Sequence, residues 1–142
     1  SEFGVMRSHV EVGRGIVDML AEEFELATLP HVDMLRNVVL HHHEASDGSG
    51  YPRGLGGDDI PPEARIVRVA DVFDALTSDR PYKTAWSDED AIDFLRRRAR
   101  SQFDQECVEA LAAQLPAAAD FRRHFAESAP AANSHEGYAA DL

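Results

Sequence analysis

The sequence is short of cysteine, of basic side chains and of long apolar runs. Its single cysteine, Cys107, excludes an internal disulfide and is typical of a protein in the reducing cytoplasm. Only 14 Lys and Arg face 26 Asp and Glu, which gives a net charge of −12. Such a surface repels a nucleic acid backbone, so no long nucleic acid partner is expected. No apolar run approaches the roughly 20 residues that cross a bilayer, so no membrane segment is expected.

A regular alternation of polar and apolar residues is also missing, and the dominant period is helical. Apolar residues recur at steps of three and four along Phe3–Phe24, where Leu20 and Phe24 complete the stripe. The same steps follow along 32–42, through Leu35. Both stripes are expected to face a core. Further helices are predicted over 63–77, 88–99, 104–115 and 117–126, with Ser87 and Asp104 as N-caps.

These patterns predict an all-α fold, a bundle of helices. A length of 142 residues fits one domain. We place this domain over residues 1–127 and expect a flexible tail over 128–142, where Ala, Pro, Asn, Ser and Gly dominate. An irregular loop with five glycines, over 46–59, interrupts the helices. It is expected to be either a mobile surface loop or a loop that approaches a ligand.

Three consecutive histidines, His41, His42 and His43, close the second predicted helix. Successive side chains on a helix point about 100° apart, so the three cannot ligate one ion in regular helical geometry. His42 continues the apolar stripe, with His43 beside it, and these two could form a metal site at a buried helix end. The alternative is a polar helix terminus that favours the negative end of the dipole. His9, beside the stripe of the first helix, is either a packed core histidine or a further ligand.

Asp71 lies in the most apolar of the predicted helices. A buried, unpaired carboxylate would cost several kcal/mol, so a cationic partner is expected. Arg65, Arg68 and Arg80 are candidates, and a metal ion is the other. Beyond the end of this helix, Arg80 and Lys83 form a pair of cations that suggests a phosphate pocket in so acidic a protein. The alternative is a pair of exposed cations at a helix C-terminus.

Three motifs in this order resemble the HD-GYP domain: His42–Glu44, Asp47–Pro52 and Ala70–Lys83. The resemblance extends over about residues 2–111. It is looser at Phe103-Asp104, where Gln105 replaces the usual proline. The HD-GYP family is similar to the HD metal-dependent phosphohydrolases and hydrolyses cyclic di-GMP in bacterial signalling.

The resemblance implies a role for each matching position. It implies metal binding by the side chains of His9, His42, His43 and Asp71, with Asp71 also in a catalytic role. It implies that Arg80 and Lys83 hold the phosphates of a cyclic dinucleotide, and that Gly50, Tyr51 and Pro52 shape the substrate pocket and contact GGDEF-domain proteins. The implied cofactors are divalent ions, iron or manganese, two or three in the complete domain, which activate water for attack on a phosphodiester.

One departure from the family pattern bears on activity. The family's His-Asp pair and a following lysine precede the position of His9, and no His-Asp dipeptide occurs in this sequence. The bundle is therefore expected to be incomplete at its N-terminus, and the chain to be weakly active or inactive. The alternative is a non-catalytic signalling module that binds a cyclic dinucleotide or a GGDEF-type partner. Helices missing from the bundle would leave apolar surface exposed, which predicts a homo-oligomer.

Overall fold

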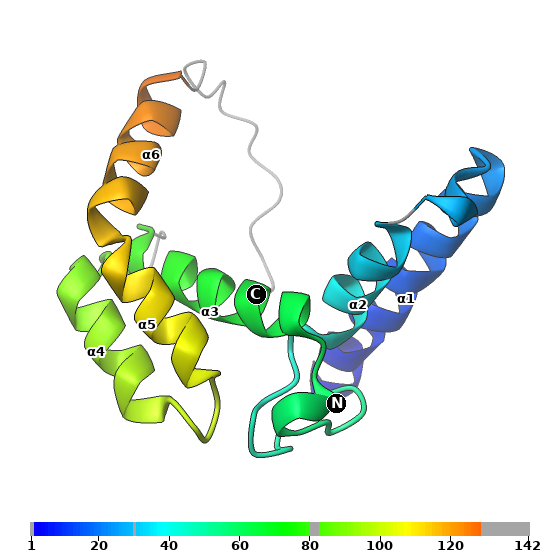
Figure 1. Cartoon of the computed structure of the whole chain (residues 1–142), viewed down its shortest axis with the longest axis horizontal. Coiled ribbons are helices and arrows are strands. Elements are labelled where there is room, and N and C mark those ends of the chain that lie inside the picture. The colour runs from blue at the N-terminus through cyan, green and yellow to red at the C-terminus, as the bar shows by residue number, and fades with distance from the viewer. Residues whose placement is uncertain (1, 30, 80–82, 129–142) are drawn as a thin grey trace. The chain divides into compact units, whose positions relative to one another are not determined.

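A computed structural model describes residues 2–29, 31–79 and 83–128. Within these ranges the chain is helical and contains no strand, so the all-α prediction is confirmed (Figure 1). No described helix is both long enough and apolar enough to cross a membrane. The predicted tail lies outside the described residues, apart from Ser128. The helices are α1 (Glu2–Glu23), α2 (Val32–His41), α3 (Pro62–Thr77), α4 (Asp88–Arg98), α5 (Gln105–Ala113) and α6 (Leu115–Ser128), with short 3-10 turns η1 (Leu26–Thr28) and η2 (Gly57–Asp59).

The chain divides into two compact units, Ser1–Ala112 and Ala113–Leu142. The second unit contains α6, in which Pro116 occupies the first turn. A proline suits that place because the first turn of a helix does not need its N–H. The first unit contains α1 to α4, most of α5 and every described residue of the candidate site.

In the first unit, α1 and α2 lie side by side (Figure 1). Val10 of α1 is completely buried. Gly13 allows the two helices to approach closely, because a Cβ there would lie 2.9 Å from Cγ1 of Val39. At the other end of the pair, Arg36 of α2 donates a hydrogen bond to Asp18 of α1 at 2.6 Å. This packing places the middle of α1 beside the C-terminal end of α2.

The predicted inward stripes are only partly correct. Leu20 and Phe24 are 44% and 63% exposed, and Leu35 of α2 is 50% exposed. The prediction failed because a helical period shows that a face is apolar, not that a neighbour covers it. In the described residues, α2 covers one side of α1 and leaves much of the opposite side open. The exposed apolar side chains of α1 and α2 are Val12, Ile16, Met19, Leu20, Met34 and Leu35.

Polar side chains fix the ends of the later helices as the sequence predicted. The N–H of Asp90 donates to Oγ of Ser87 at 3.1 Å and caps α4. The N–H of Cys107 donates to Oδ1 of Asp104 at 3.0 Å and caps α5. The other oxygen of Asp104 accepts a hydrogen bond from Arg65 of α3 at 2.7 Å. Asp104 therefore joins the start of α5 to α3.

Candidate metal centre

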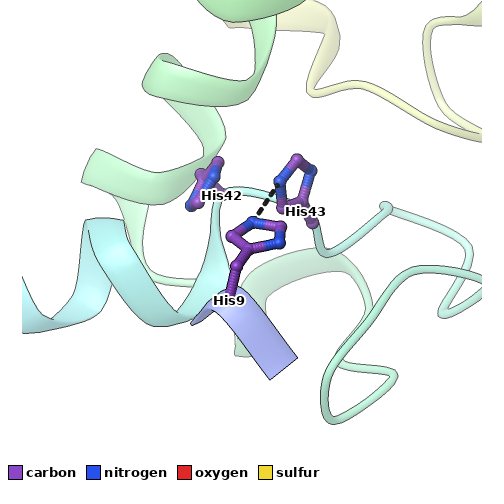
Figure 2. A group of neighbouring side chains, drawn as sticks. All are labelled: His9, His42 and His43. Carbon is purple, nitrogen blue, oxygen red and sulfur yellow. Dashed lines mark hydrogen bonds between the residues drawn. The ribbon is translucent and has the colours of Figure 1, made fainter. Parts of the chain in front are cut away.

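Three imidazoles converge where α1 passes the C-terminal end of α2. His9 comes from α1, His42 is the C-cap of α2, and His43 follows it (Figure 2). One ring nitrogen from each lies within 4.8 Å of the others. The Nε2 atoms of His9 and His43 are 3.2 Å apart. Two segments 34 residues apart in sequence therefore contribute to one cluster.

The end of α2 explains how two adjacent histidines point the same way. The helix ends at His41, and the chain has left it by His43, so the helical spacing of side chains no longer applies. The rings of His42 and His43 lie with centroids 4.0 Å apart. His41 does not join them; it is buried, with Nδ1 3.7 Å from Oε1 of Glu44. As expected, the three consecutive histidines do not all contribute to one cluster, because the side chain of His41 lies beside Glu44 instead.

The hydrogen bonds of His42 determine which of its nitrogens is free to bind an ion. Nδ1 lies 2.8 Å from the carbonyl oxygen of Val38 and 3.2 Å from that of Val39. A carbonyl only accepts, so Nδ1 carries the proton of the neutral ring. Nε2 then keeps its lone pair, and the bond to the backbone fixes the ring's orientation, as is usual for metal-binding histidines.

The electrostatics of the cluster favour a neutral ring for His43. Burial, followed by the proximity of His42 and His9, lowers the pKa of His43 to about 4. Neutral imidazole is the form that binds a metal ion. Two nitrogen ligands about 2.1 Å from one ion, at tetrahedral or octahedral angles, lie roughly 3.0 to 3.4 Å apart. The Nε2 atoms of His9 and His43, at 3.2 Å, match that spacing. This pair of nitrogens therefore fits one divalent ion, with a nitrogen of His42 within 4.8 Å of both as a candidate third ligand.

Tyr51 of the glycine-rich loop lies against this cluster. Its ring stacks on His43, with centroids 4.8 Å apart and an interplanar angle of 20°, and meets His9 edge-on at 6.5 Å. Its N–H donates to the carbonyl of His43 at 3.2 Å. The peptide bond to Pro52 is cis. Before it, Gly50 lies so close to the start of the loop that a Cβ would be 2.3 Å from the backbone nitrogen of Ala45. The predicted Gly50-Tyr51-Pro52 motif thus adjoins the imidazoles.

The structure does not bring Asp71 into the cluster. Asp71 is exposed, and the expectation of a buried carboxylate is wrong. The reason is that α3 buries Val69 and Phe73, which lie on the opposite side of the helix from Asp71. In the described part of the chain Asp71 forms no ion pair, because Arg65 binds Asp104 and Arg68 donates to the carbonyl of Gln102 at 3.0 Å. Whether Asp71 binds metal stays a prediction.

Of the two predicted phosphate-binding cations, Arg80 and Lys83, the structure describes only Lys83. Arg80 lies outside the described residues, as do its neighbours 81–82. The ammonium of Lys83 donates to the carbonyl of Ala75 at 3.0 Å, in the last turn of α3, and lies 5.5 Å from the ring centroid of Trp86. Lys83 therefore stabilises a helix C-terminus, which is the location that one of its two predicted interpretations gives, but the residue is half-buried rather than exposed. Its contact with phosphate stays a prediction.

Sequence reasoning assigned no role to Glu44, which precedes the glycine-rich loop and which the structure ties to that loop by hydrogen bonds. The side chain is 0% exposed, and its oxygens accept hydrogen bonds from the N–H groups of Arg53 and Leu55. The available signal was a carboxylate between the histidines and a run of glycines. Its partners are backbone groups, which a sequence pattern does not identify.

Comparisons with known proteins identify the family. Residues 22–107 match the HD domain family. The chain is 44% identical over 110 residues to the cyclic di-GMP phosphodiesterase response regulator RpfG of Xanthomonas campestris, which covers 78% of this chain and 27% of that relative. It is 38% identical over 109 residues to a cyclic di-GMP phosphodiesterase of Thermotoga maritima (77% and 28%). It is 38% identical over 110 residues to 3'3'-cGAMP-specific phosphodiesterase 2 of Vibrio cholerae (78% and 20%). The chain thus spans about a quarter of the length of these relatives.

Proposed function

The chain belongs to the HD domain family, of the HD-GYP type that its motifs predicted, and from that premise we propose that it is part of a metal-dependent phosphodiesterase for cyclic dinucleotides. The observation that carries the proposal is the convergence of His9, His42 and His43: the Nε2 atoms of His9 and His43 have the spacing of two ligands to one ion, and a nitrogen of His42 lies within 4.8 Å of both. The names of the relatives support the substrate class, with cyclic di-GMP as the first candidate.

In this proposal the three imidazoles hold a divalent ion, iron or manganese. Such an ion polarises a phosphodiester and lowers the pKa of bound water. His42 keeps its ring in a fixed orientation through the backbone bond at Nδ1. Tyr51 covers one face of His43 and limits the access of water from that side. The phenol ring also offers a flat surface beside the imidazoles for a purine base.

Asp71, Arg80 and Lys83 enter the proposal through the resemblance. Asp71 is proposed as a carboxylate ligand, and Arg80 and Lys83 as contacts to the phosphates. The direct test of Asp71 is a metal titration of Asp71→Asn. Weaker Mn(II) binding than in the wild-type chain supports a ligand role, and unchanged binding contradicts it.

We propose that this chain alone turns over cyclic dinucleotides slowly. It contains no His-Asp dipeptide, so three imidazoles and one carboxylate are available for what the family builds with a larger ligand set. The exposure of Asp71 away from the cluster favours a second candidate function, a signalling module that binds a cyclic dinucleotide or a GGDEF-type protein without cleaving it. The two candidates differ in whether binding requires metal and whether product forms.

The test combines turnover and binding. The purified chain is incubated with Mn(II) or Fe(II) and cyclic di-GMP, and the linear dinucleotide and GMP are separated by chromatography. Slow, metal-dependent product formation that is lost in His43→Ala supports the proposed enzyme. Dinucleotide binding that persists in EDTA without any product supports the module. Robust turnover contradicts the proposed weak activity, and neither binding nor product contradicts both functions.

We also propose a location and an assembly. The single cysteine supports a reducing cytoplasm. The exposed apolar side chains on the outer side of α1, from Val12 to Leu20, support self-association, because a contiguous apolar surface of this kind is usually covered.

A further inference from the structure

The carboxylate of Glu44, directly after the imidazole cluster in sequence, organises the loop that follows. The side chain is completely buried. Oε1 accepts from the N–H of Arg53 at 2.8 Å, and Oε2 accepts from the N–H of Leu55 at 3.0 Å. A buried carboxylate costs several kcal/mol unless it is hydrogen-bonded, so both bonds stabilise its position. Glu44 therefore ties the end of α2 to backbone groups nine and eleven residues further along the chain.

Backbone groups, rather than a cation, satisfy this carboxylate in the described residues. Nδ1 of His41 lies 3.7 Å from Oε1, which is too far for a hydrogen bond. That nitrogen is buried and has no hydrogen-bond partner of its own. The contacts of Glu44 thus fix the path of the loop, and they do so from a residue adjacent to His43.

The chain between these anchors brings Tyr51 to His43. The backbone bond from Tyr51 N–H to the His43 carbonyl and the stacked rings hold this part of the loop at the cluster. Gly50 leaves no room for adjustment, because even a methyl group there would overlap the backbone of Glu44 and Ala45. A shift of the loop would therefore break the stack on His43.

We propose that Glu44 is a positioning residue for the metal centre. By accepting hydrogen bonds from the N–H groups of Arg53 and Leu55, it holds Tyr51 against His43 and so fixes the orientation of the His43 ring. Its effect on metal binding rests on the proposed function, whereas its effect on the loop does not. Mutating a residue that orients a metal ligand without being one itself typically lowers metal affinity by about 10- to 100-fold.

Two variants of Glu44 separate hydrogen bonding from charge. Glu44→Gln keeps the size of the side chain but puts an NH₂ group against a backbone N–H, so one of the two bonds is lost. Glu44→Asp keeps the charge but withdraws the oxygens by one methylene, and it replaces Glu44→Gln in the measurements if that variant does not fold. Tyr51→Ala gives the reference state without the stack. Val108→Ala, at a completely buried position of α5, controls for a general loss of stability.

The first readout needs no metal. A stacked aromatic ring displaces the NMR frequencies of the ring protons of His43, and Tyr51→Ala removes that displacement. Glu44→Gln is expected to move these frequencies most of the way from the wild-type values to those of Tyr51→Ala, whereas Val108→Ala leaves them at the wild-type values. Wild-type frequencies in Glu44→Gln, or an equal change in Val108→Ala, overturn the inference.

The second readout is a Co(II) titration followed by absorbance. Glu44→Gln is expected to bind Co(II) about tenfold more weakly than the wild-type chain. If the effect runs through Tyr51, adding Glu44→Gln to Tyr51→Ala should weaken Co(II) binding little beyond what Tyr51→Ala does alone. Equal weakening in both backgrounds overturns a route through Tyr51. A wild-type chain that binds no Co(II) contradicts the proposed metal centre, and the NMR frequencies then decide the role of Glu44 by themselves.

Discussion

The loop that follows His43 and the outer side of α1 are opposites in how completely they are packed. In the loop, a buried carboxylate, a glycine without space for a Cβ and a stacked tyrosine leave few groups unsatisfied. On the outer side of α1, Ile16 and Met19 are 48% and 60% exposed. The same helix thus contributes the exposed His9 to the imidazole cluster and presents large apolar side chains to solvent.

The difference teaches which part of the site this chain assembles by itself. The imidazoles and the loop are brought together in the described residues by the stack on His43, by the bonds of Glu44 and by a bond from the Asp47 N–H to the carbonyl of Ser101. The Nε2 atoms of His9 and His43 have the spacing of two ligands to one ion. Asp71 lies outside that cluster and is exposed, as the outer side of α1 is. The described residues therefore assemble the imidazoles and the loop, and they do not bring Asp71 to them.

Removing one imidazole is the most direct way to break the assembled region. His43→Ala is expected to weaken Mn(II) binding by more than about 100-fold, beyond the usual effect of losing an outer-shell partner. The dissociation constant is measured by calorimetry. His31→Ala is the matched control, because His31 is exposed at the start of α2 and makes no capping hydrogen bond. Equal losses in both variants would show that binding does not depend on the cluster.

A pair of glycine substitutions compares the packing of the two regions directly. Gly50→Ala is expected to destabilise the fold by up to about 3 kcal/mol, because its Cβ would overlap backbone atoms that cannot move aside. Gly15→Ala on α1, where nothing lies within 4 Å, is expected to stabilise the helix by about 0.5 to 1 kcal/mol. Chemical denaturation measures both free energies of unfolding. Similar effects of the two substitutions would contradict the contrast.

Charges on the outer side of α1 test whether that surface is an interface. Sedimentation of the wild-type chain is expected to show concentration-dependent self-association. Ile16→Glu with Met19→Glu is expected to weaken it by about tenfold or more, since burying each apolar side chain contributes about 1.5 to 3 kcal/mol. Ala110→Glu with Ala113→Glu adds the same charge at exposed positions of α5. A wild-type chain that stays monomeric at all concentrations refutes the interface.

The smallest effect concerns the ion pair that joins α3 to α5. Burial opposes ionisation of Asp104, but hydrogen bonds from the Cys107 N–H and from Arg65 outweigh it and lower the Asp104 pKa. The stability that this provides is present above pH ~4 and is lost as the pH falls through the lowered pKa. Asp104→Asn, which retains the cap, is expected to lose about 1 to 2 kcal/mol at pH 7.

The pH dependence of that loss is the check. The difference in unfolding free energy between the wild-type chain and Asp104→Asn should shrink as the pH falls below about 4. Asp58→Asn is the control, because Asp58 lies 3.5 Å from the same arginine but is fully exposed. It should change stability little at any pH, and a difference that persists at low pH would contradict the ion-pair explanation.

The helices could be predicted from sequence because their signals are local. Ser87 and Asp104 cap α4 and α5 as predicted, since a cap depends on residues three positions away. The predicted burial of Asp71 was wrong because burial, unlike a cap, is not decided by nearby residues. The many apolar neighbours in its helix indicate that the helix has a buried side, but which side is covered depends on elements distant in the chain.

The candidate site shows the same division. His42 and His43 could be selected from their place at a helix end, whereas the proximity of His9 came from the family resemblance and depends on how α1 packs against α2. Glu44 had no assigned role, because its partners are amides of Arg53 and Leu55. Every residue except proline has a backbone N–H, so the sequence does not indicate which of these groups will bond to Glu44. The path of the loop in the structure does.

The position of His42 at the very end of α2 couples ligand geometry to the fraying of a helix. Its N–H donates to the carbonyl of Val38 at 3.1 Å, and its side chain bonds to the same carbonyl. When the last turn opens, as helix ends do, both bonds break and the backbone no longer fixes the orientation of the ring. An ion held there would therefore favour the closed turn and slow the exchange of the His42 amide with solvent, so that occupancy of the centre could be read from the backbone of α2.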